Sequence, residues 1–373
     1  MTTAKLIYDT SANADLYYIT RFSCTDAFLY LEVKGKHYVI LNALEFDRAK
    51  RTAKVDEVLP REKYSDLAAK QGRSGAAAYT LEVLKEFGVS ECIVPHNTPL
   101  AFADKLRAYG MSVKLGDDPF AMARTCKTAE EKKLMLAAQK VTFRAIKLVE
   151  TTLKQSKIKN KKIIFNGKAL TSELLRSKVM IFLLEKGYEC EDAPIIAGGK
   201  QGCDPHERGS GLLKAHESII VDVFPRGSKA RYFGDATRTF CKGKAPEALK
   251  KMYAIVKQAQ ETAIKQVKAG VNGKTIHQQV KDFFTTQGYP TGPNRGRNEG
   301  FIHGTGHSLG LEIHEEPFRI NSSDCIIKAG NMLTVEPGLY YQDIGAVRIE
   351  DIVYVTQTGN KVLAGYPKKL EIA

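Results

Sequence analysis

Three histidines and three glutamates lie close together in HGTGHSLGLEIHEEP, residues 303–317. Two histidines four residues apart can bind zinc from one face of a helix, as in HExxH peptidases. Here, however, His303 and His307 enclose Gly-Thr-Gly, and each glycine inside a helix costs about 1 kcal/mol relative to alanine. We therefore expect an extended or looped backbone. The glycines read GxGxxxG outside any strand-loop-helix frame, which argues against a phosphate-binding loop.

Acidic residues recur in apolar runs that predict buried strands: Asp222 in IIVDVF, Asp235 in YFGDATRTF, Glu336 in MLTVE and Glu350 in VRIEDIVYV. An ionised carboxylate is costly to bury unless it is paired or coordinates a cation, and a lone one usually has an ordinary hydrogen-bond or salt-bridge partner. Four together need more positive charge than the nearby Arg238 and Arg348 supply. Two divalent cations, with one neutral histidine, would balance them. Oxygen-rich ligation of this kind suits Mn²⁺, Fe²⁺ or Co²⁺ at least as well as Zn²⁺.

The organisation of the chain determines what can hold these residues in place. Residues 1 to about 115 alternate short strand-like runs, such as YLEVKGKHYVIL, with helices, and they predict a small mixed domain. Turn residues follow in LGDDPFAMARTCK. Thr128 and Glu131 then form a capping-box pattern, which predicts a long helix that runs toward Lys154. We therefore expect domains at 1–122 and 123–373.

The second domain interleaves helices with strands. Helices are expected from about 171 to 186 and after Pro246, where apolar residues recur at helical spacing. Strand-like runs surround them: ESIIVDVF, RYFGDATRTF, NMLTVEPGLYY and GAVRIEDIVYVT. This order predicts an α+β fold with a curved, mostly antiparallel sheet.

Composition excludes several classes of protein. The 373 residues, 43% of them hydrophobic, suffice for well-buried cores. The net charge of +14 comes mostly from lysines scattered along helical stretches without interleaved aromatic residues, which favours a solvated cationic surface and predicts neither a nucleic-acid nor a membrane partner. Seven scattered cysteines without a CxxC pair, and an N-terminus without a signal pattern, favour a soluble protein of the cytoplasm.

Five motifs in order link the candidate residues to a known family: DPHERG, VDVF…FGDATRTF, HGTGHSLGLEIHEEP, TVEPGLYY and GAVRIED. Spanning about residues 203–351, they resemble the metallopeptidase family of aminopeptidase P, prolidase and methionine aminopeptidase, whose catalytic domain has the "pita-bread" fold. Arg124, Lys127 and Glu131 resemble the R-x-x-K-x-x-x-E linker that follows a creatinase-like N-terminal domain. The resemblance thus implies a creatinase-like domain at 1–122, a pita-bread domain at 123–373 and a homodimer.

The resemblance also implies a role for each candidate residue. Five residues would hold two divalent cations, with manganese placed ahead of Co²⁺, Fe²⁺ or Zn²⁺: Asp222, Asp235, His307, Glu336 and Glu350. The substrate site would be lined by His206, His303, His314 and Arg348. Among these, His314 is expected to hydrogen-bond the developing oxyanion and Glu336 to carry a proton to the leaving nitrogen. His206 and Arg348 complete the expected catalytic set, and Arg348 shares a strand face with Glu350.

One departure from the family pattern concerns Asp222. The family has D-x-G at this point, whereas this chain has Asp222-Val-Phe224, and its spacing to Asp235 is two residues longer. An ungapped match would put Phe224 in a ligand position, and phenylalanine cannot coordinate a hard cation. We therefore expect a longer hairpin, with the extra residues in the turn PRGSKAR and Asp222 still facing Asp235.

The expected substrates are peptides with proline in second position. The N-terminal domain favours aminopeptidase P or prolidase over methionine aminopeptidase, and the metal ligands argue against creatinase. Aminopeptidase P, which releases the first residue of a longer peptide, is placed ahead of an Xaa-Pro dipeptidase. The alternative from another class is a catalytically silent pita-bread module that binds peptides or acidic partners.

Overall fold

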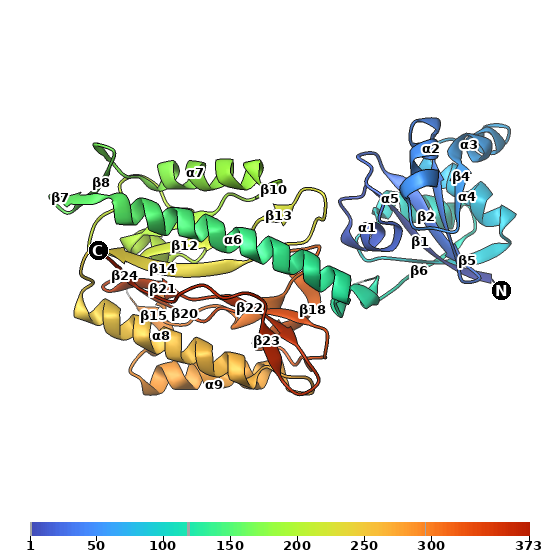
Figure 1. Cartoon of the computed structure of the whole chain (residues 1–373). Helices are drawn as coiled ribbons and strands as arrows, with labels where there is room; N and C mark the ends of the chain where they lie inside the picture. The colour runs from blue at the N-terminus through green and yellow to red at the C-terminus, as the bar shows by residue number, and fades with distance from the viewer. Residues whose placement is uncertain (1, 118–119, 295) are drawn as a thin grey trace. The chain divides into compact units, whose positions relative to one another are not determined.

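The computed structural model describes residues 2–117, 120–294 and 296–373. The chain divides into two compact units, Met1–Arg124 and Thr125–Ala373 (Figure 1). Within the described residues, no helix combines the length and the apolar character that crossing a bilayer requires.

The first unit is built on a six-stranded mixed sheet in the order β4-β3-β2-β1-β5-β6. The strands are β1 (Thr2–Asp9), β2 (Phe28–Val33), β3 (Lys36–Leu41), β4 (Glu57–Pro60), β5 (Val89–Val94) and β6 (Ser112–Leu115). The helices are α1 (Ala14–Thr20), α2 (Ala43–Thr52), α3 (Arg61–Ala69), α4 (Ala76–Glu86) and α5 (Leu100–Ala108). Because successive strand residues face opposite sides, Leu6 packs with α3, α4 and α5 while Ile7 packs with α1 and α2. The unit therefore has three layers.

The second unit contains two helix-covered regions. The first, called here the Asp half, has α6 (Ala129–Gln155) and α7 (Ser172–Glu185) against a sheet in the order β11-β12-β14-β24. Its strands are β11 (Ile195–Gly198), β12 (Ile219–Val223), β14 (Ala236–Lys242) and β24 (Glu371–Ile372). Short strands flank it: β7 (Lys157–Lys159), β8 (Lys162–Phe165), β9 (Lys168–Ala169), β10 (Tyr188–Glu189) and β13 (Arg226–Gly227).

The second region, called the Glu half, has α8 (Glu247–Gln266) and α9 (Gly273–Thr286) with a sheet in the order β18-β17-β19-β22-β23. Its strands are β17 (Gly306–Ser308), β18 (Glu315–Ile320), β19 (Met332–Val335), β22 (Asp351–Val355) and β23 (Asn360–Val362). Two hairpins accompany it, formed by β15 (Gly292–Asn294), β16 (Arg297–Glu299), β20 (Gly338–Tyr341) and β21 (Gly345–Arg348).

Each half has its own apolar core beneath its helices. In Figure 1, α6 and α7 lie on one side of the unit, α8 and α9 lie on the other, and the strands run between them. Residues of α6 and α7 such as Ile146 and Val179 are fully buried against β12 and β14, whereas Val256 of α8 is buried against β19 and β22. Among the described residues of the second unit, the strand pairs are antiparallel except for β14 with β24. The predicted α+β fold with a mostly antiparallel sheet is confirmed.

The linker motif is buried at the start of α6. The capping box predicted at its N-terminus is confirmed, because the Thr128 side chain accepts from Glu131 N–H and the Glu131 carboxylate accepts from Thr128 N–H. Glu131 also accepts a hydrogen bond of 2.5 Å from the Tyr232 hydroxyl. Lys127 Nζ lies 2.6 Å from Glu315 Oε2, with both side chains at most 1% exposed. Within the first unit, Arg124 pairs with Asp15 at 2.7 Å.

The sequence expectation that all four acidic residues sit within strands is wrong for three of them. Asp222 lies inside β12, but Asp235 directly precedes β14, Glu336 directly follows β19, and Glu350 lies between β21 and β22. At Glu350 the chain passes from the β20–β21 hairpin into the larger sheet, and its N–H donates to the Thr237 carbonyl at 3.1 Å. Strand ends therefore present these carboxylates to a common space.

Candidate active site

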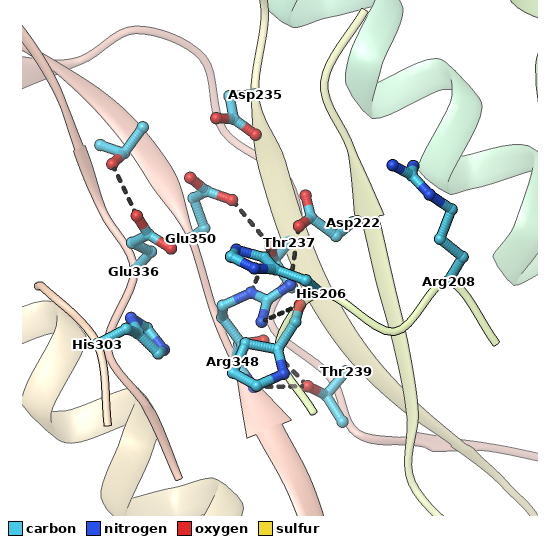
Figure 2. Close-up of polar contacts among 12 residues, drawn as sticks. His206, Arg208, Asp222, Asp235, Thr237, Thr239, His303, Glu336, Arg348 and Glu350 are labelled. Atoms are coloured by element: carbon cyan, nitrogen blue, oxygen red, sulfur yellow. Dashed lines mark hydrogen bonds and ion pairs between the residues drawn. The ribbon is translucent and has the colours of Figure 1, made fainter. Parts of the chain in front are cut away.

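A cavity of about 710 Å³ opens within the second unit. Its lining includes every residue that the motifs singled out: His206, Asp222, Asp235, His303, His307, His314, Glu336, Arg348 and Glu350. Figure 2 shows the four carboxylates converging from both halves, with Arg348 beneath Asp222. The residues come from six separate segments of the chain, so only the tertiary fold brings them together.

Three of the predicted metal ligands form the tightest group. One ligand atom from each of Asp235, His307 and Glu350 lies within 4.8 Å of the other two. His307 Nε2 is 3.6 Å from Asp235 Oδ2 and 3.4 Å from Glu336 Oε1. The fourth carboxylate, Glu336, therefore borders the same group.

The backbone around His307 fixes which ring nitrogen faces the acids. A Cβ on Gly306 would overlap the carbonyl oxygen of Thr334, so glycine is what allows β17 to approach β19 here. His307 N–H donates to Thr334 Oγ1 at 3.0 Å, and its Nδ1 lies 3.2 Å from the Ser308 carbonyl. A carbonyl only accepts, so Nδ1 carries the proton and Nε2 keeps its lone pair. Burial lowers the pKa of His307 to about 3, which keeps the ring neutral.

Asp222 occupies a different setting from the other acids. It faces Thr237 in the β12–β14 register, and Asp235 lies two residues before Thr237 toward the same face. Its Oδ2 accepts from Arg348 Nη2 at 2.8 Å. Its Oδ1 is buried, and no hydrogen bond reaches it from the described residues. One oxygen is thus held by the protein while the other is left for a ligand in the cavity.

The connection between β12 and β14 contains the additional residues of this chain. β13 pairs with β10, and a tight turn follows in which Arg231 N–H donates to Gly227 O at 2.7 Å. Arg231 adopts a left-handed backbone with φ 64°. Phe224 lines the cavity as an apolar wall. The lengthened turn therefore lies outside the paired segment that carries Asp222.

The remaining carboxylates are strongly perturbed by burial. Burial raises the pKa of Glu336 to about 7, against the opposing charge of Arg348. Burial also raises the pKa of Asp235 and of Glu350, and in both cases neighbouring carboxylates raise it further. Thr237 Oγ1 donates to Glu350 Oε2 at 2.8 Å. The acids therefore repel one another in the absence of a cation.

A chain of hydrogen bonds joins Arg348 to His303. Arg348 Nη1 donates to the Tyr340 hydroxyl at 2.8 Å, and that hydroxyl lies 2.7 Å from His303 Nε2. His303 Nδ1 lies 2.7 Å from the Gly304 carbonyl, so Nδ1 is the donor and Tyr340 donates to Nε2. Burial lowers the pKa of His303 to about 3. Both of its nitrogens are engaged within the protein, although the ring lines the cavity.

His314 and His206 differ from His303 in their surroundings. The His314 ring packs edge-on against His307, with centroids 4.3 Å apart, and burial lowers its pKa. His206 is exposed in the loop before β12, where its N–H donates to Asp204 Oδ1 at 3.1 Å. His314 is therefore part of the cavity wall and His206 part of its rim.

Sequence reasoning missed two arginines that also line the cavity, Arg208 and Arg319. Arg208 Nη2 bonds Asp192 at 2.9 Å, and Arg319 pairs with Glu316. Arg208 lies inside the recognised motif DPHERG, and Arg319 lies two residues after HEEP. A cationic side chain beside a motif histidine was the available signal.

The residues of the cavity fit divalent cations. The four candidate carboxylates share the space with one buried arginine, Arg348, and with His307 and His314, which burial keeps neutral. The unpartnered Asp222 Oδ1 and the Nε2 lone pair of His307 both supply donor atoms. Hard oxygen ligands with a single nitrogen match divalent ions of the first transition series.

Comparison with known proteins decides the family. Residues 133–357 match the model of metallopeptidase family M24. The chain belongs to this family. As an M24 metallopeptidase it is a hydrolase of peptide bonds that uses divalent metal ions, and the resemblance seen in the motifs is confirmed.

Two relatives illustrate how far the similarity to this M24 peptidase extends. The chain is 29% identical over 250 residues to the uncharacterized peptidase YqhT of Bacillus subtilis, a match that covers 67% of this chain but 65% of that protein. It is 26% identical over 363 residues to an Xaa-Pro dipeptidase of Pyrococcus horikoshii, covering 96% of this chain and 92% of that protein.

Solved structures show the same fold. An X-Pro aminopeptidase from Thermotoga maritima superposes with a TM-score of 0.81 at 22% identity, covering 100% of this chain and 98% of that one. At such identity the likeness concerns the fold alone. The M24 pita-bread fold expected from the motifs is thereby confirmed.

Proposed function

We propose that this M24 peptidase hydrolyses the bond between an N-terminal residue and a following proline, with two divalent cations held by Asp222, Asp235, His307, Glu336 and Glu350. The observation that carries the proposal is the group of ligand atoms from Asp235, His307 and Glu350 within 4.8 Å of one another. Both the matched Pyrococcus protein and the Thermotoga protein are named for Xaa-Pro substrates. Manganese is the proposed metal.

Dipeptides are the proposed preferred substrates, ahead of the longer peptides that the motifs alone had placed first. The relative that matches 96% of this chain is named an Xaa-Pro dipeptidase. Arg319 lines the cavity, and its guanidinium lies close enough to His314 to contribute to lowering the pKa of that ring. The free carboxylate of a dipeptide lies next to the scissile bond, and arginine is the side chain best suited to bind it in two-point fashion.

The present partner of Arg319 does not prevent this role. Arg319 pairs with Glu316, and the two side chains are 37% and 44% exposed. An exposed pair of this kind contributes little, about 0–1 kcal/mol. A substrate carboxylate can therefore replace Glu316 at small cost.

The chain's own residues suggest how the reaction proceeds. Bound divalent cations supply an electrophile for the carbonyl oxygen and raise the acidity of water. Glu336 lines the cavity beside His307 and is the group proposed to accept a proton and carry it to the leaving nitrogen. That proton is needed by the leaving proline nitrogen, because a tertiary amide carries none. Neutral His314 can donate a hydrogen bond to the oxygen that gains charge.

Substrate choice is tested by comparing kcat/KM for Ala-Pro and Ala-Pro-Ala after loading with Mn²⁺ or Co²⁺. We expect faster turnover of Ala-Pro. A preference for Ala-Pro-Ala would instead support aminopeptidase P, and turnover of neither would disprove the Xaa-Pro specificity. Metal analysis addresses the silent alternative, since about two equivalents per chain support the enzyme and none supports the binding module.

The role of Arg319 has its own control. In Arg319→Met, kcat/KM for Ala-Pro should fall about 10–100-fold, which corresponds to losing a charged hydrogen bond of about 1.5–3 kcal/mol. Ala-Pro-amide lacks the carboxylate and should be affected much less. Equal losses for the two substrates would show that Arg319 does not bind the carboxylate.

The homodimer and the cytoplasmic location expected from the motifs and composition stay predictions. Light scattering of the purified chain measures the first, and fractionation of the source cells measures the second.

A further inference from the structure

A buried glutamine of α6 holds the main chain of Asp235. Gln139 is 0% exposed. Its Nε2 donates to the Asp235 carbonyl at 2.8 Å, and its Oε1 accepts from the Asp235 N–H at 2.8 Å. A single side-chain amide thus satisfies both peptide groups of a residue 96 positions away in the sequence.

Asp235 needs such a partner because it lies outside the sheet. The β12–β14 ladder ends at the pair Val223 and Ala236, so Asp235 is the first residue beyond it. Buried backbone groups without a partner are costly. The Gln139 amide replaces the missing strand, and its two opposed hydrogen bonds restrict rotation of the Asp235 backbone.

The neighbouring glycine allows α6 to come this close. A Cβ on Gly234 would lie 2.7 Å from the Ala138 carbonyl carbon and 2.8 Å from Gln139 N. Any other residue would push the loop away from the helix. Gly234 and Gln139 therefore act together to seat the Asp235 segment on α6.

The Glu half has a corresponding glutamine on α8. Gln260 is also 0% exposed, and its Nε2 donates to the Val335 carbonyl at 3.2 Å and to Asp351 Oδ2 at 3.1 Å. Val335 and Asp351 face each other at the end of the β19–β22 ladder. Glu336 and Glu350 are the adjacent residues on the two strands, at the point where both leave the sheet.

We propose that Gln139 and Gln260 are positioning residues of the metal centre, each fixing from its own helix the strand ends that carry the acidic ligands. The inference rests on the ligand set of the proposed function. It deepens that function by assigning a role to two side chains that bind the backbone of a ligand or the residues next to the ligands. Gln139 contacts a proposed ligand directly, whereas Gln260 acts one residue away, so Gln139 should have the larger effect.

The test measures metal affinity by calorimetry on metal-free protein, together with its unfolding. In Gln139→Met the affinity for Mn²⁺ should fall about 10–100-fold, the usual loss when a residue supporting a metal ligand is removed. In Gln260→Met a smaller loss is expected, since Lys368 still contacts Asp351 at 3.1 Å. Gln139→Glu, which keeps the acceptor for Asp235 N–H, should bind more tightly than Gln139→Met.

Thr152→Val supplies the control for a purely structural role. Thr152 lies on α6, is 3% exposed and donates to the Leu148 carbonyl at 2.9 Å, so its loss destabilises the same helix away from the site. This variant should unfold more easily and bind Mn²⁺ with unchanged affinity. If Gln139→Met resembles Thr152→Val in both measurements, the positioning role is wrong. If the unaltered protein binds no metal, the proposed function itself fails.

Discussion

The Asp half and the Glu half are built alike, yet neither holds its own acids alone. Each has two helices over antiparallel strands, an apolar core, and two acidic residues in or beside its strands. Asp222 of the Asp half is bound by Arg348 at 2.8 Å, from β21. Glu350 accepts its 2.8 Å hydrogen bond from Thr237 of the Asp half. The candidate metal centre therefore needs residues of both halves and lies at the boundary between them, which is called here the seam.

Buried ion pairs lie at the seam, whereas the core of each half is apolar. Arg238 of β14 pairs with Asp351 of β22 at 2.6 Å, with side chains 1% and 3% exposed. Lys127, which precedes α6, pairs with Glu315 of β18. Buried ion pairs contribute little net stability but strongly penalise wrong partners. We infer that the cores fold each half and that the charges specify how the halves meet.

The largest effect is expected from removing the carboxylate at the centre of the seam. In Glu350→Gln, kcat/KM should fall by more than the about 10²–10³-fold that follows loss of one oxyanion-hole donor, because a proposed metal ligand would be lost. Glu261→Gln alters an exposed glutamate on α8 of the Glu half and should leave activity unchanged. Full metal binding in Glu350→Gln would contradict the proposed ligand set.

Breaking a seam ion pair should affect folding more than breaking a surface pair. Lys127→Met removes the cation that pairs with the buried Glu315, so the free energy of unfolding should fall by about 3–5 kcal/mol. Lys154→Met removes an exposed lysine from Glu150 on α6, which keeps its pair with Lys147, and should cost about 0–1 kcal/mol. Urea denaturation measures both. Similar losses would mean that the seam charges do not specify the contact between halves.

Substituting Asp222 should impair the site less than substituting Glu350, because one Asp222 oxygen is already bound by Arg348. Asp222→Ala is expected to lower Mn²⁺ affinity about 10–100-fold, the range typical of residues that support a ligand set. Titration calorimetry gives both affinity and stoichiometry. Unchanged binding would show that Asp222 is only the counter-ion of Arg348, and the Asp half would then supply a single ligand.

Local signals in the sequence predicted the helices of both halves well. The capping box at Thr128 marks the start of α6 because both of its hydrogen bonds are made within four residues. The strand ends were predicted poorly. Whether Glu350 continues a strand depends on the chain changing sheets there and on Thr237, 113 positions away. Periodicity within one window contains no such information.

The acidic ligands were recognisable, whereas their supports were not. A carboxylate in an apolar run is conspicuous because its burial is costly. Gln139 lies in an amphipathic helix, where one more polar residue looks ordinary, and its partner Asp235 is 96 positions away. Arg319 could have been found, since it lies two residues after the HEEP motif. Long-range polar partners are thus what the sequence conceals.

The smallest expected effect is the pH dependence of stability, which reports proton binding by the buried carboxyls. Burial raises the pKa of Glu336 from 4.5 to about 7 in the metal-free protein, so the folded state binds this proton more tightly than the unfolded state does. The stabilisation from this Glu336 proton is complete below the pKa of the unfolded state, 4.5, and is lost as the pH rises through the folded pKa of about 7. The lowered pKa values of His303 and His307 act in the opposite direction only below about 6.5, the ordinary value for histidine.

Between pH 6.5 and about 7, therefore, the Glu336 carboxyl dominates, and metal-free protein should lose stability by up to about 1.4 kcal/mol per pH unit as the pH rises. Urea denaturation with a chelator measures this slope. Mn²⁺-loaded protein should show a flatter profile because its ligands are already deprotonated, and Glu336→Gln should flatten the metal-free profile by removing one of the groups. A metal-free stability that rises across this window would mean that the two halves do not force their acids together.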